Sequence, residues 1–482
     1  MKSSSISGGA IPAYHPDQVL LKLRPGAVES LELAGAAPAM FTAAARSLPG
    51  LSALHRLERG GQIRRVTPLS PRAELAASDA GPSHAFASLA AAARPVAKPD
   101  ANAGVSLVEL EHGADPDALC QELAADPEVE AASRVPVRYW CARRRRADAP
   151  AAAGATAPAA TPPISPMWNL ARIRWAEART RPGFQDANAV RVAVLDTGID
   201  AAHPDLAAAV KHYVYAHPHG TAPSGPKDYI GHGTHVAGTI AATIGNELGI
   251  NGVCACEIHA WKIFDDEPDY YGGYFHYFTD TVMYHRALAD CVDGGIQVVN
   301  LSIGGTGLPD FNERRLFDAL LSSGITVVAA MGNSRASGSP TSYPAAIPGV
   351  IAVGATNIKD EVASFSNRGS HIALVAPGQD IWSTLPTYPG QTGFQVRYEN
   401  GKPVTGVPAK RDTDYATWDG TSMAAPHVAA AAALLHAKHP GIAPDQVLAR
   451  LKASADKVPG MQGRAEHPDY GAGRLNLFRL LA

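Results

Sequence analysis

Two different patterns of hydrophobic and polar residues divide the chain. From Trp168 to the C-terminus, short apolar runs alternate with segments of helical periodicity. Near-continuous apolar strands between helices are typical of a parallel sheet that is covered on both faces. The second part of the chain is therefore predicted to be α/β. Its expected strands cover 190–195, 258–264, 296–303, 325–330 and 350–353, and its expected helices cover 232–244 and 281–292.

The residues before about 141 predict a smaller α+β unit. Strand candidates at 18–23 and 105–110 are followed by an amphipathic helix at 115–125 and by a further extended segment at 129–140. Between the first two strands, the Ala/Pro/Arg-rich stretch 70–102 is expected to be a long loop.

The composition changes abruptly after this first unit. Four arginines, Arg143 to Arg146, lead into an Ala/Pro/Thr/Gly tract without periodicity that ends near Pro166. A basic run of this kind can bind an acidic surface, but the composition favours a solvated linker that a protease can reach. The predicted organisation is an N-terminal domain at 1–141, a linker at 142–166 and a main domain at 167–482.

With 482 residues and a formal net charge of −3, the chain offers no electrostatic case for nucleic acid or a membrane as its main partner. No apolar run approaches the length that spans a bilayer. Met1–Pro16 lacks the apolar core of a secretory signal. We therefore expect a cytoplasmic protein, one exported by another route, or a secreted one whose signal was removed. Five sparse cysteines imply no disulfide framework and favour buried free thiols over a metal site.

Three polar motifs contain candidate catalytic residues, and an α/β sheet usually carries such residues at the carboxyl ends of its strands. Asp196 follows a predicted strand, His232 begins a glycine-flanked helix, and Ser422 lies in the turn 420–427 before an apolar run. A serine nucleophile needs a base, and a histidine oriented by a carboxylate is such a base. Taken singly, Asp196 and Ser422 are also typical turn or cap residues, and His232 a typical core residue. His232 and His235 form only an i, i+3 pair, which gives little support to a metal site.

Together these motifs resemble those of the subtilisin-like serine proteases, or subtilases, from Trp168 to about Leu477. The order Asp, His, Ser along the chain is the order in subtilisin. The resemblance implies a subtilisin-like three-layer α/β fold with a mostly parallel central sheet. It also implies that Asp196 orients His232, that His232 is the base, and that Ser422 is the nucleophile. The segment ending at Asn333 resembles the family's oxyanion segment, so the Asn333 amide is expected to bind the oxyanion.

Two further segments resemble the substrate-binding strands of this family. One is Leu301–Gly305, where glycines let a peptide backbone approach closely. The other contains Gly272 and Gly273, between two tyrosines. The acidic run Asp265–Asp269 either favours basic substrates or is a solvated loop, and we expect the loop and a broad specificity. The candidate binding residues are Ser302, Ile303, Gly304, Gly305, Gly272 and Gly273.

The segment Thr243–Gly252 resembles the family's calcium loop. The resemblance implies a structural Ca²⁺ and no organic cofactor. It also implies a cis peptide bond at Tyr343–Pro344. Residues 388–414 depart from compact family members, and we expect them to form a hairpin at the active-site rim. The implied calcium ligands are side-chain oxygens of Asp205 and Asn246 and carbonyl oxygens of Ile244, Leu248 and Ile250.

The N-terminal domain resembles subtilase propeptides in the plan of its elements. The resemblance implies a folding chaperone and intramolecular inhibitor that is cut off between Trp140 and Pro166; a separate accessory domain is the alternative. The expected function is that of a monomeric serine endopeptidase acting on peptides or proteins. The alternatives are an inactive scaffold that binds peptides by strand addition and a dedicated intracellular processing protease.

Overall fold

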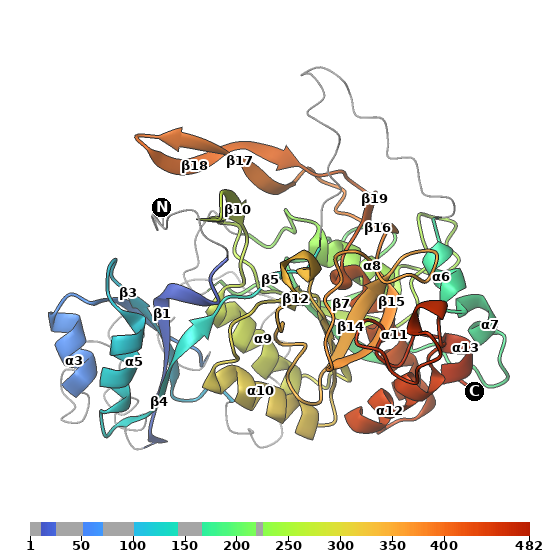
Figure 1. The fold of residues 1–482 in the computed structure, drawn as a ribbon, viewed down its shortest axis with the longest axis horizontal. Coiled ribbons are helices and arrows are strands. Elements are labelled where there is room, and N and C mark those ends of the chain that lie inside the picture. Colours follow the sequence, from blue (N-terminus) through green and yellow to red (C-terminus); the bar gives the residue numbers. More distant parts are fainter. Residues whose placement is uncertain (1–10, 26–51, 71–100, 143–165, 218–224) are drawn as a thin grey trace, which may run out of the picture.

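The central element of the structure is a seven-stranded parallel sheet with helices on both faces (Figure 1). The computed structural model describes residues 11–25, 52–70, 101–142, 166–217 and 225–482. Most of the linker expected at 142–166 and of the loop expected at 70–102 therefore lies outside the described residues.

The strand order in this sheet is β15-β14-β13-β11-β6-β8-β7. Every pair of neighbours runs parallel, which confirms the α/β prediction. β7 was not predicted because it is an edge strand with polar, partly exposed residues, and the apolar β15 was also missed. The strands are β6 (Arg191–Asp196), β7 (Val210–Val214), β8 (Glu257–Lys262), β11 (Val298–Leu301), β13 (Thr326–Ala330), β14 (Ile351–Thr356) and β15 (Ile372–Pro377).

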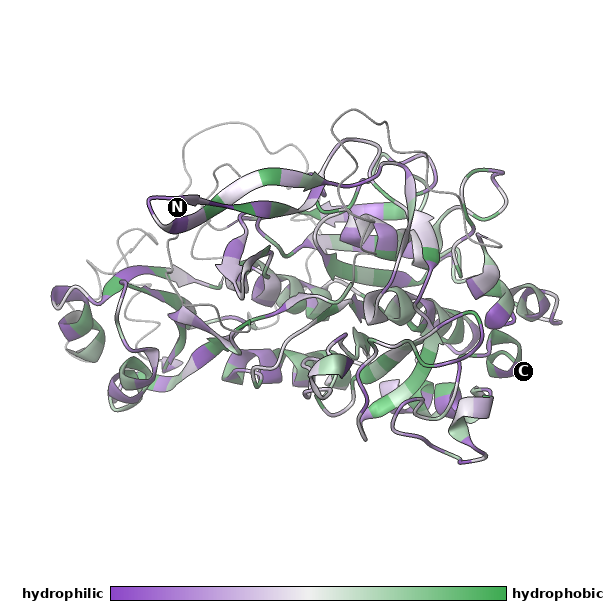
Figure 2. Cartoon of the chain, turned by 45° about the horizontal axis from the view of Figure 1, so that its top comes forward, coloured by the Kyte–Doolittle hydropathy of each residue, from purple (hydrophilic) through white to green (hydrophobic). Residues whose placement is uncertain are grey.

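Alternate residues of β6 define the three layers. Val192 and Val194 pack on one side with α8 (His232–Ala241) and α11 (Thr421–Lys438). Ala193 and Leu195 pack on the other side with α9 (Thr281–Asp293) and α10 (Phe311–Ser322). This alternation follows from the two-residue period of a strand. Hydrophobic residues accordingly concentrate in the central sheet and the helices beside it (Figure 2). The short helices α6 (Trp168–Arg172), α7 (Trp175–Arg179), α12 (Pro444–Ser454) and α13 (Leu477–Leu480) complete the domain.

The N-terminal part forms a four-stranded antiparallel sheet beside the larger domain, in the order β2-β3-β1-β4. One of its faces is covered by α3 and α5, and α5 begins at the N-cap Asp115, as its acidic opening predicted. The sequence did not reveal α3 and β2, which are short elements. The bounds are β1 (Tyr14–Leu23), α3 (Ser52–Arg59), β2 (Ile63–Pro68), β3 (Val105–Leu110), α5 (Pro116–Ala124) and β4 (Val129–Pro136).

The opposite face of this small sheet docks on α9 and α10. Leu20 and Leu107 form one buried cluster with Val282 of α9. Polar contacts surround that cluster: Thr281 Oγ1 donates to Gln18 Oε1 at 2.9 Å, and Arg286 Nε donates to the Leu69 carbonyl oxygen at 3.0 Å. The two domains therefore share a buried interface as well as a chain.

Two hairpins and the strand pair of β16 (Ile381–Thr384) and β19 (Tyr415–Trp418) lie outside the main sheet. The insertion at 388–414 contains the predicted hairpin, β17 (Gln391–Glu399) and β18 (Lys402–Lys410), which runs over β10 (Figure 1). The Phe275 and Phe394 rings meet edge to face at 6.5 Å, and the Tyr270 and Tyr398 hydroxyls are 3.1 Å apart. The other hairpin is β9 (Asp269–Tyr271) with β10 (Tyr274–His276). β16 and β19, which flank the insertion, pair antiparallel.

Several smaller expectations are also answered. The Tyr343–Pro344 peptide bond is cis, as the resemblance implied. All five cysteines are free, and all but the half-buried Cys120 are buried. Within the described ranges, no helix combines the length and the hydrophobicity that crossing a bilayer would require.

Three buried histidines make the stability of this fold depend on pH. Burial lowers the pKa of His235 to about 3 and the pKa values of His427 and His436 to about 4. Between these values and the ordinary pKa near 6.5, the unfolded chain binds protons that the folded chain does not. We predict that the free energy of unfolding falls as pH is lowered from about 6.5 to 4.5, by up to about 1.4 kcal/mol per pH unit for each histidine.

Urea unfolding at several pH values measures this slope. His436→Gln should make the slope shallower by about one proton, because the unfolded chain of the variant has one histidine fewer to protonate. A free energy of unfolding that does not change over this pH range would contradict the prediction.

Candidate active site

Asp196 and His232 lie side by side in the core. Asp196 ends β6, and His232 is the first residue of α8. His232 Nδ1 is 2.6 Å from Asp196 Oδ1, and both side chains are buried. Among the described residues, His232 Nε2 has no hydrogen-bond partner. The imidazole therefore has one nitrogen held by a carboxylate and the other available to exchange a proton with a reacting group.

A buried carboxylate that the sequence did not reveal fixes the start of α8. Asp228 Oδ1 accepts from the Gly231 N–H at 2.8 Å and from Thr197 Oγ1 at 2.8 Å. Asp228 Oδ2 accepts from both the N–H and the hydroxyl of Thr234, at 3.0 and 2.7 Å. Because these donors lie on both sides of His232 and directly after Asp196, Asp228 ties the two elements that carry the pair. Its role depends on contacts across the fold, which no local motif records.

Ser422 lies in the first turn of α11, a helix that is buried from Thr421 to His436. Its Oγ donates to the Ser302 carbonyl oxygen at 2.8 Å, and Ser302 Oγ donates back to the Ser422 carbonyl oxygen at 3.0 Å. Asn333 accepts from the Thr421 N–H through Oδ1 at 3.0 Å, which leaves its Nδ2 to donate elsewhere. The structure thus brings Ser422, Asn333 and Ser302 together at the start of α11.

The C-terminal end of the N-terminal domain occupies this site as an added strand. β5 (Tyr139–Trp140) pairs antiparallel with β12 (Ile303–Gly304), in the register Trp140 to Ile303 and Tyr139 to Gly304. The Cys141 N–H continues the ladder to the Ser302 carbonyl oxygen at 3.1 Å. The predicted strand 296–303 is therefore interrupted at Ser302, and its second piece, β12, pairs with β5 of the same chain.

The Cys141 carbonyl oxygen receives two hydrogen bonds from the site. Asn333 Nδ2 donates to it, and the Ser422 N–H donates to it at 3.2 Å. Two donors on one carbonyl oxygen, beside a serine hydroxyl, are the arrangement that stabilises the oxyanion of acyl transfer. The Trp140 ring lies 5.2 Å from the His232 ring, centroid to centroid.

Glycine is required where the bound segment passes. A Cβ atom at position 420 would lie 2.4 Å from the Cys141 carbonyl oxygen and 2.8 Å from the Ala142 Cα atom. A Cβ atom at position 305 would lie 2.1 Å from the Val137 carbonyl oxygen. The close approach of another backbone, which the sequence suggested for this segment, is therefore present at Gly305, whereas a Cβ atom at position 304 would meet the Ser342 and Cys141 side chains.

Gly272 and Gly273 are not the residues that pair with the bound segment in this structure. They form the turn between β9 and β10, and both have positive φ angles. The opposite side of the bound segment pairs with Phe278 instead, across from Tyr139, and the Thr279 N–H donates to the Arg138 carbonyl oxygen at 2.9 Å. A glycine in a tight turn and a glycine beside a bound peptide look alike in a sequence.

Two of the predicted calcium residues, Asn246 and Ile250, contact Asp205. Its carboxylate is fully buried and lies 2.7 Å from Asn246 Nδ2 and 3.2 Å from the Ile250 N–H. The Tyr415 hydroxyl is 3.3 Å away. The Asp205 and Asn246 oxygens are of the kind that Ca²⁺ prefers, but the Asn246 oxygen accepts from the Leu248 N–H at 3.1 Å, so a half-turn of the amide would be needed to present it beside the carboxylate. Within the described residues, no cluster of three His, Cys, Asp or Glu side chains could hold a metal.

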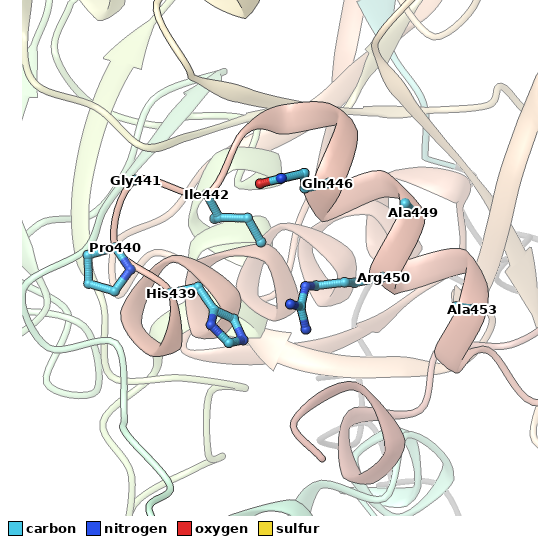
Figure 3. Close-up of a pocket in the computed structure, with 8 residues that line it drawn as sticks. All are labelled: His439, Pro440, Gly441, Ile442, Gln446, Ala449, Arg450 and Ala453. Atoms are coloured by element: carbon cyan, nitrogen blue, oxygen red, sulfur yellow. The ribbon is translucent and has the colours of Figure 1, made fainter.

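A surface pocket of about 650 Å³ lies away from these residues, between the end of α11 and α12 (Figure 3). It is lined by residues such as His439, Ile442 and Arg450. About 17 residues of helix, or roughly 25 Å, separate it from Ser422. It contains none of the predicted site residues.

The fold, the Asp196–His232 pair and the position of Ser422 at the start of α11 fit a serine endopeptidase of the subtilisin type. Residues 187–473 match the model of the subtilase family, and the chain belongs to that family. It is 37% identical to subtilisin E of Bacillus subtilis (strain 168) over 314 residues, which cover 64% of this chain and 70% of that protein. It is 38% identical to a subtilisin of Bacillus pumilus over 314 residues, covering 64% of this chain and 96% of that protein.

A solved structure shares the fold over nearly the whole chain. The crystal structure of fervidolysin from Fervidobacterium pennivorans, a keratinolytic enzyme related to subtilisin, aligns with 99% of this chain at a TM-score of 0.62 and 23% identity. This chain spans 62% of the length of that one. The likeness therefore concerns the fold.

Asp228 gives a test of how the site is held. We predict that Asp228→Ala lowers the free energy of unfolding by about 3 kcal/mol, because it leaves buried donors unpaired. It should also lower kcat by about tenfold or more, because displacing a catalytic group by about 1 Å is costly. Thermal unfolding and peptide hydrolysis measure the two effects. The exposed Asp318→Ala serves as a control that should change neither; an unchanged kcat in Asp228→Ala would contradict the positioning role.

Proposed function

We propose that this subtilase hydrolyses peptide bonds through Ser422, His232 and Asp196, and that it first cuts its own chain between Cys141 and Ala142. The observation that carries the proposal is the Cys141 carbonyl oxygen, which accepts from Asn333 Nδ2 and from the Ser422 N–H. A carbonyl held by both donors beside the nucleophile is oriented as a substrate.

In the first step, Ser422 Oγ attacks the Cys141 carbonyl carbon and passes its proton to His232 Nε2. The Ser422 hydroxyl must first leave the Ser302 carbonyl oxygen, to which it now donates. The oxyanion forms on the oxygen that Asn333 and the Ser422 N–H already contact. Asp196 stabilises the imidazolium through His232 Nδ1, at 2.6 Å.

In the second step, the bond from the Cys141 carbonyl carbon to the Ala142 nitrogen breaks. His232 returns its proton to that nitrogen, which leaves as a free amine, and Cys141 remains as an ester on Ser422. Water then attacks the ester with His232 as base, which frees Ser422 and gives Cys141 a carboxylate. The same steps would apply to other peptides that bind along β12.

The N-terminal domain would act as an inhibitor of the uncut and newly cut enzyme. Residues 139–141 fill the strand position that a substrate needs, and the small sheet is anchored on α9 and α10. An anchored segment has a high effective concentration at the site, so it competes well against free substrates. This role rests on the proposed cleavage and on the family's usual arrangement.

We also propose a structural Ca²⁺ at the loop that follows α8. Asp205 and Asn246 would hold it through side-chain oxygens, with the carbonyl oxygens of Ile244, Leu248 and Ile250. The ion would supply positive charge beside a buried carboxylate and cross-link the loop to Asp205. No step of the reaction passes through it.

Ser422 provides the decisive test of the cleavage proposal. We predict that the wild-type full-length chain is cut after Cys141 and is labelled by a fluorophosphonate probe, whereas Ser422→Ala stays intact and unlabelled. Intact-mass spectrometry and gel fluorescence measure these results. The exposed Ser370→Ala serves as the control, because it keeps the nucleophile and should be cut and labelled like the wild type.

Equal labelling of wild type and Ser422→Ala would reject the nucleophile. A fully active wild-type chain that remains intact would reject the inhibitor role of the N-terminal domain. A wild-type protein that is neither labelled nor cut would favour the peptide-binding scaffold.

Removal of calcium tests the metal proposal. We predict that a chelator lowers the melting temperature by several degrees, because a ligand at about 100 times its Kd stabilises the folded state by about 2.7 kcal/mol. Differential scanning calorimetry with and without chelator measures the shift, and Asp205→Asn should abolish it. Equal melting temperatures for the wild type under both conditions would remove the claim.

A further inference from the structure

Arg138 is the fourth residue before the proposed scissile bond, and its side chain is almost completely buried. Its backbone lies next to β5, which pairs with β12, and its carbonyl oxygen accepts from the Thr279 N–H at 2.9 Å. The guanidinium is 1% exposed, although arginine is rarely buried without a partner. The bound segment thus inserts a charged side chain into the peptidase domain.

The partner of Arg138 is Glu313, in the first turn of α10. Arg138 Nε donates to Glu313 Oε1 at 3.1 Å, and Arg138 Nη2 donates to Glu313 Oε2 at 2.7 Å. Arg138 Nη1 donates to the Gly307 carbonyl oxygen at 2.9 Å. All three nitrogens of the guanidinium therefore have acceptors in the peptidase domain. A two-point contact between guanidinium and carboxylate specifies arginine in both charge and shape.

The peptidase domain holds Glu313 in place independently of Arg138. The Tyr284 hydroxyl donates to Glu313 Oε1 at 3.0 Å, and burial, together with the Glu313 charge, raises the pKa of Tyr284 well above its ordinary value. Asp310 caps α10 and accepts from the Glu313 N–H at 2.8 Å. The carboxylate also lies at a helix N-terminus, where a negative charge is favourable. The acidic group is therefore built into the pocket before any arginine arrives.

Gly305, which has no side chain, leaves space for the Arg138 side chain. A Cβ atom at position 305 would lie 3.2 Å from Arg138 Nη1. Gly305 belongs to the segment that pairs with the peptide backbone, so the entrance to the Glu313 pocket is continuous with the substrate strand. Any peptide bound in the register of residues 138–141 directs its fourth side chain to this entrance.

We propose that Glu313 forms the specificity subsite for the fourth residue before the scissile bond, and that this subsite selects arginine in substrates. The proposal rests on the proposed peptidase function and names its substrate class: chains that carry arginine at this position. An apolar side chain there would leave the Glu313 carboxylate buried without its cation, which is unfavourable. Lysine would supply the charge without the two-point contact.

The acidic run Asp265–Asp269 is a poorer source of a basic preference. Asp266 is already engaged, since both its oxygens lie 2.8 Å from Lys262 Nζ. Lys262 is itself buried and also donates to the Lys227 carbonyl oxygen at 2.8 Å. Asp266 therefore serves a structural contact, and Glu267 beside it is exposed.

A peptide series tests the subsite directly. Internally quenched peptides reproduce residues 136–142, with alanine in the place of Cys141. At the position of Arg138 they carry either the native arginine or citrulline, lysine or norleucine. Citrulline has the shape of arginine without its charge. For the wild-type protein, expressed as the full chain, kcat/KM should be at least about tenfold higher for the arginine peptide than for the citrulline and norleucine peptides.

Glu313→Gln should reduce this ratio to about one while it hydrolyses the citrulline peptide at a rate within about threefold of wild type. Glu267→Gln, the matched control, should keep the ratio. If Glu313→Gln does not fold, the double variant Arg138→Gln/Glu313→Gln replaces it, because no buried charge is then left unpaired.

Equal kcat/KM values for the arginine and citrulline peptides in the wild type would overturn the proposal, as would an arginine preference that survives Glu313→Gln. In both cases the Arg138–Glu313 pair only anchors the N-terminal domain. A failure of the peptidase function itself gives a different result, since no peptide of the series is then cut and Ser422 is not labelled.

Discussion

The structure depends on burying α11 from Thr421 to His436. A helix without a polar face is stable only inside a protein, and the small side chains of its alanine run let the sheet and α8 approach it closely. Ser422 stands at the start of this helix, so the position of the nucleophile is set by the packing of the core. The same packing holds β6 and α8, which carry Asp196 and His232. Rigid elements of this kind position a reacting group better than loops can.

The segment from Tyr139 to Cys141, which occupies the site, shows how a peptide is bound there. The ladder from Tyr139 to Cys141 fixes the register of the backbone, and the donors on the Cys141 carbonyl oxygen identify the bond that faces the nucleophile. Once that bond is identified, the positions of the other side chains of the segment indicate where the neighbouring subsites lie. Trp140 lies on His232, and Arg138 enters an acidic pocket. Backbone pairing and side-chain pairing thus point to the same register.

The sequence predicts the parts of this protein that rest on local pattern. Buried apolar runs predicted β6, β8 and β13 to within a few residues. The short motifs around Asp196, His232 and Ser422 can also be recognised from the sequence alone. Glu313 could not be found in this way, because its partner is 175 residues away and the run from Asp310 to Glu313 resembles an ordinary helix start. β7 was missed because an edge strand has little apolar surface to bury.

The contacts of Arg138 also determine how quickly the site becomes free. The proposed cut after Cys141 would remove none of them, since the paired strand and the ion pair with Glu313 lie before that bond. The rate of dissociation depends on the contacts that must be broken, and a buried, two-point ion pair is slow to break. Activity towards other substrates should therefore appear after a lag. The length of that lag is set by the departure of the tail and not by the chemistry that cuts it.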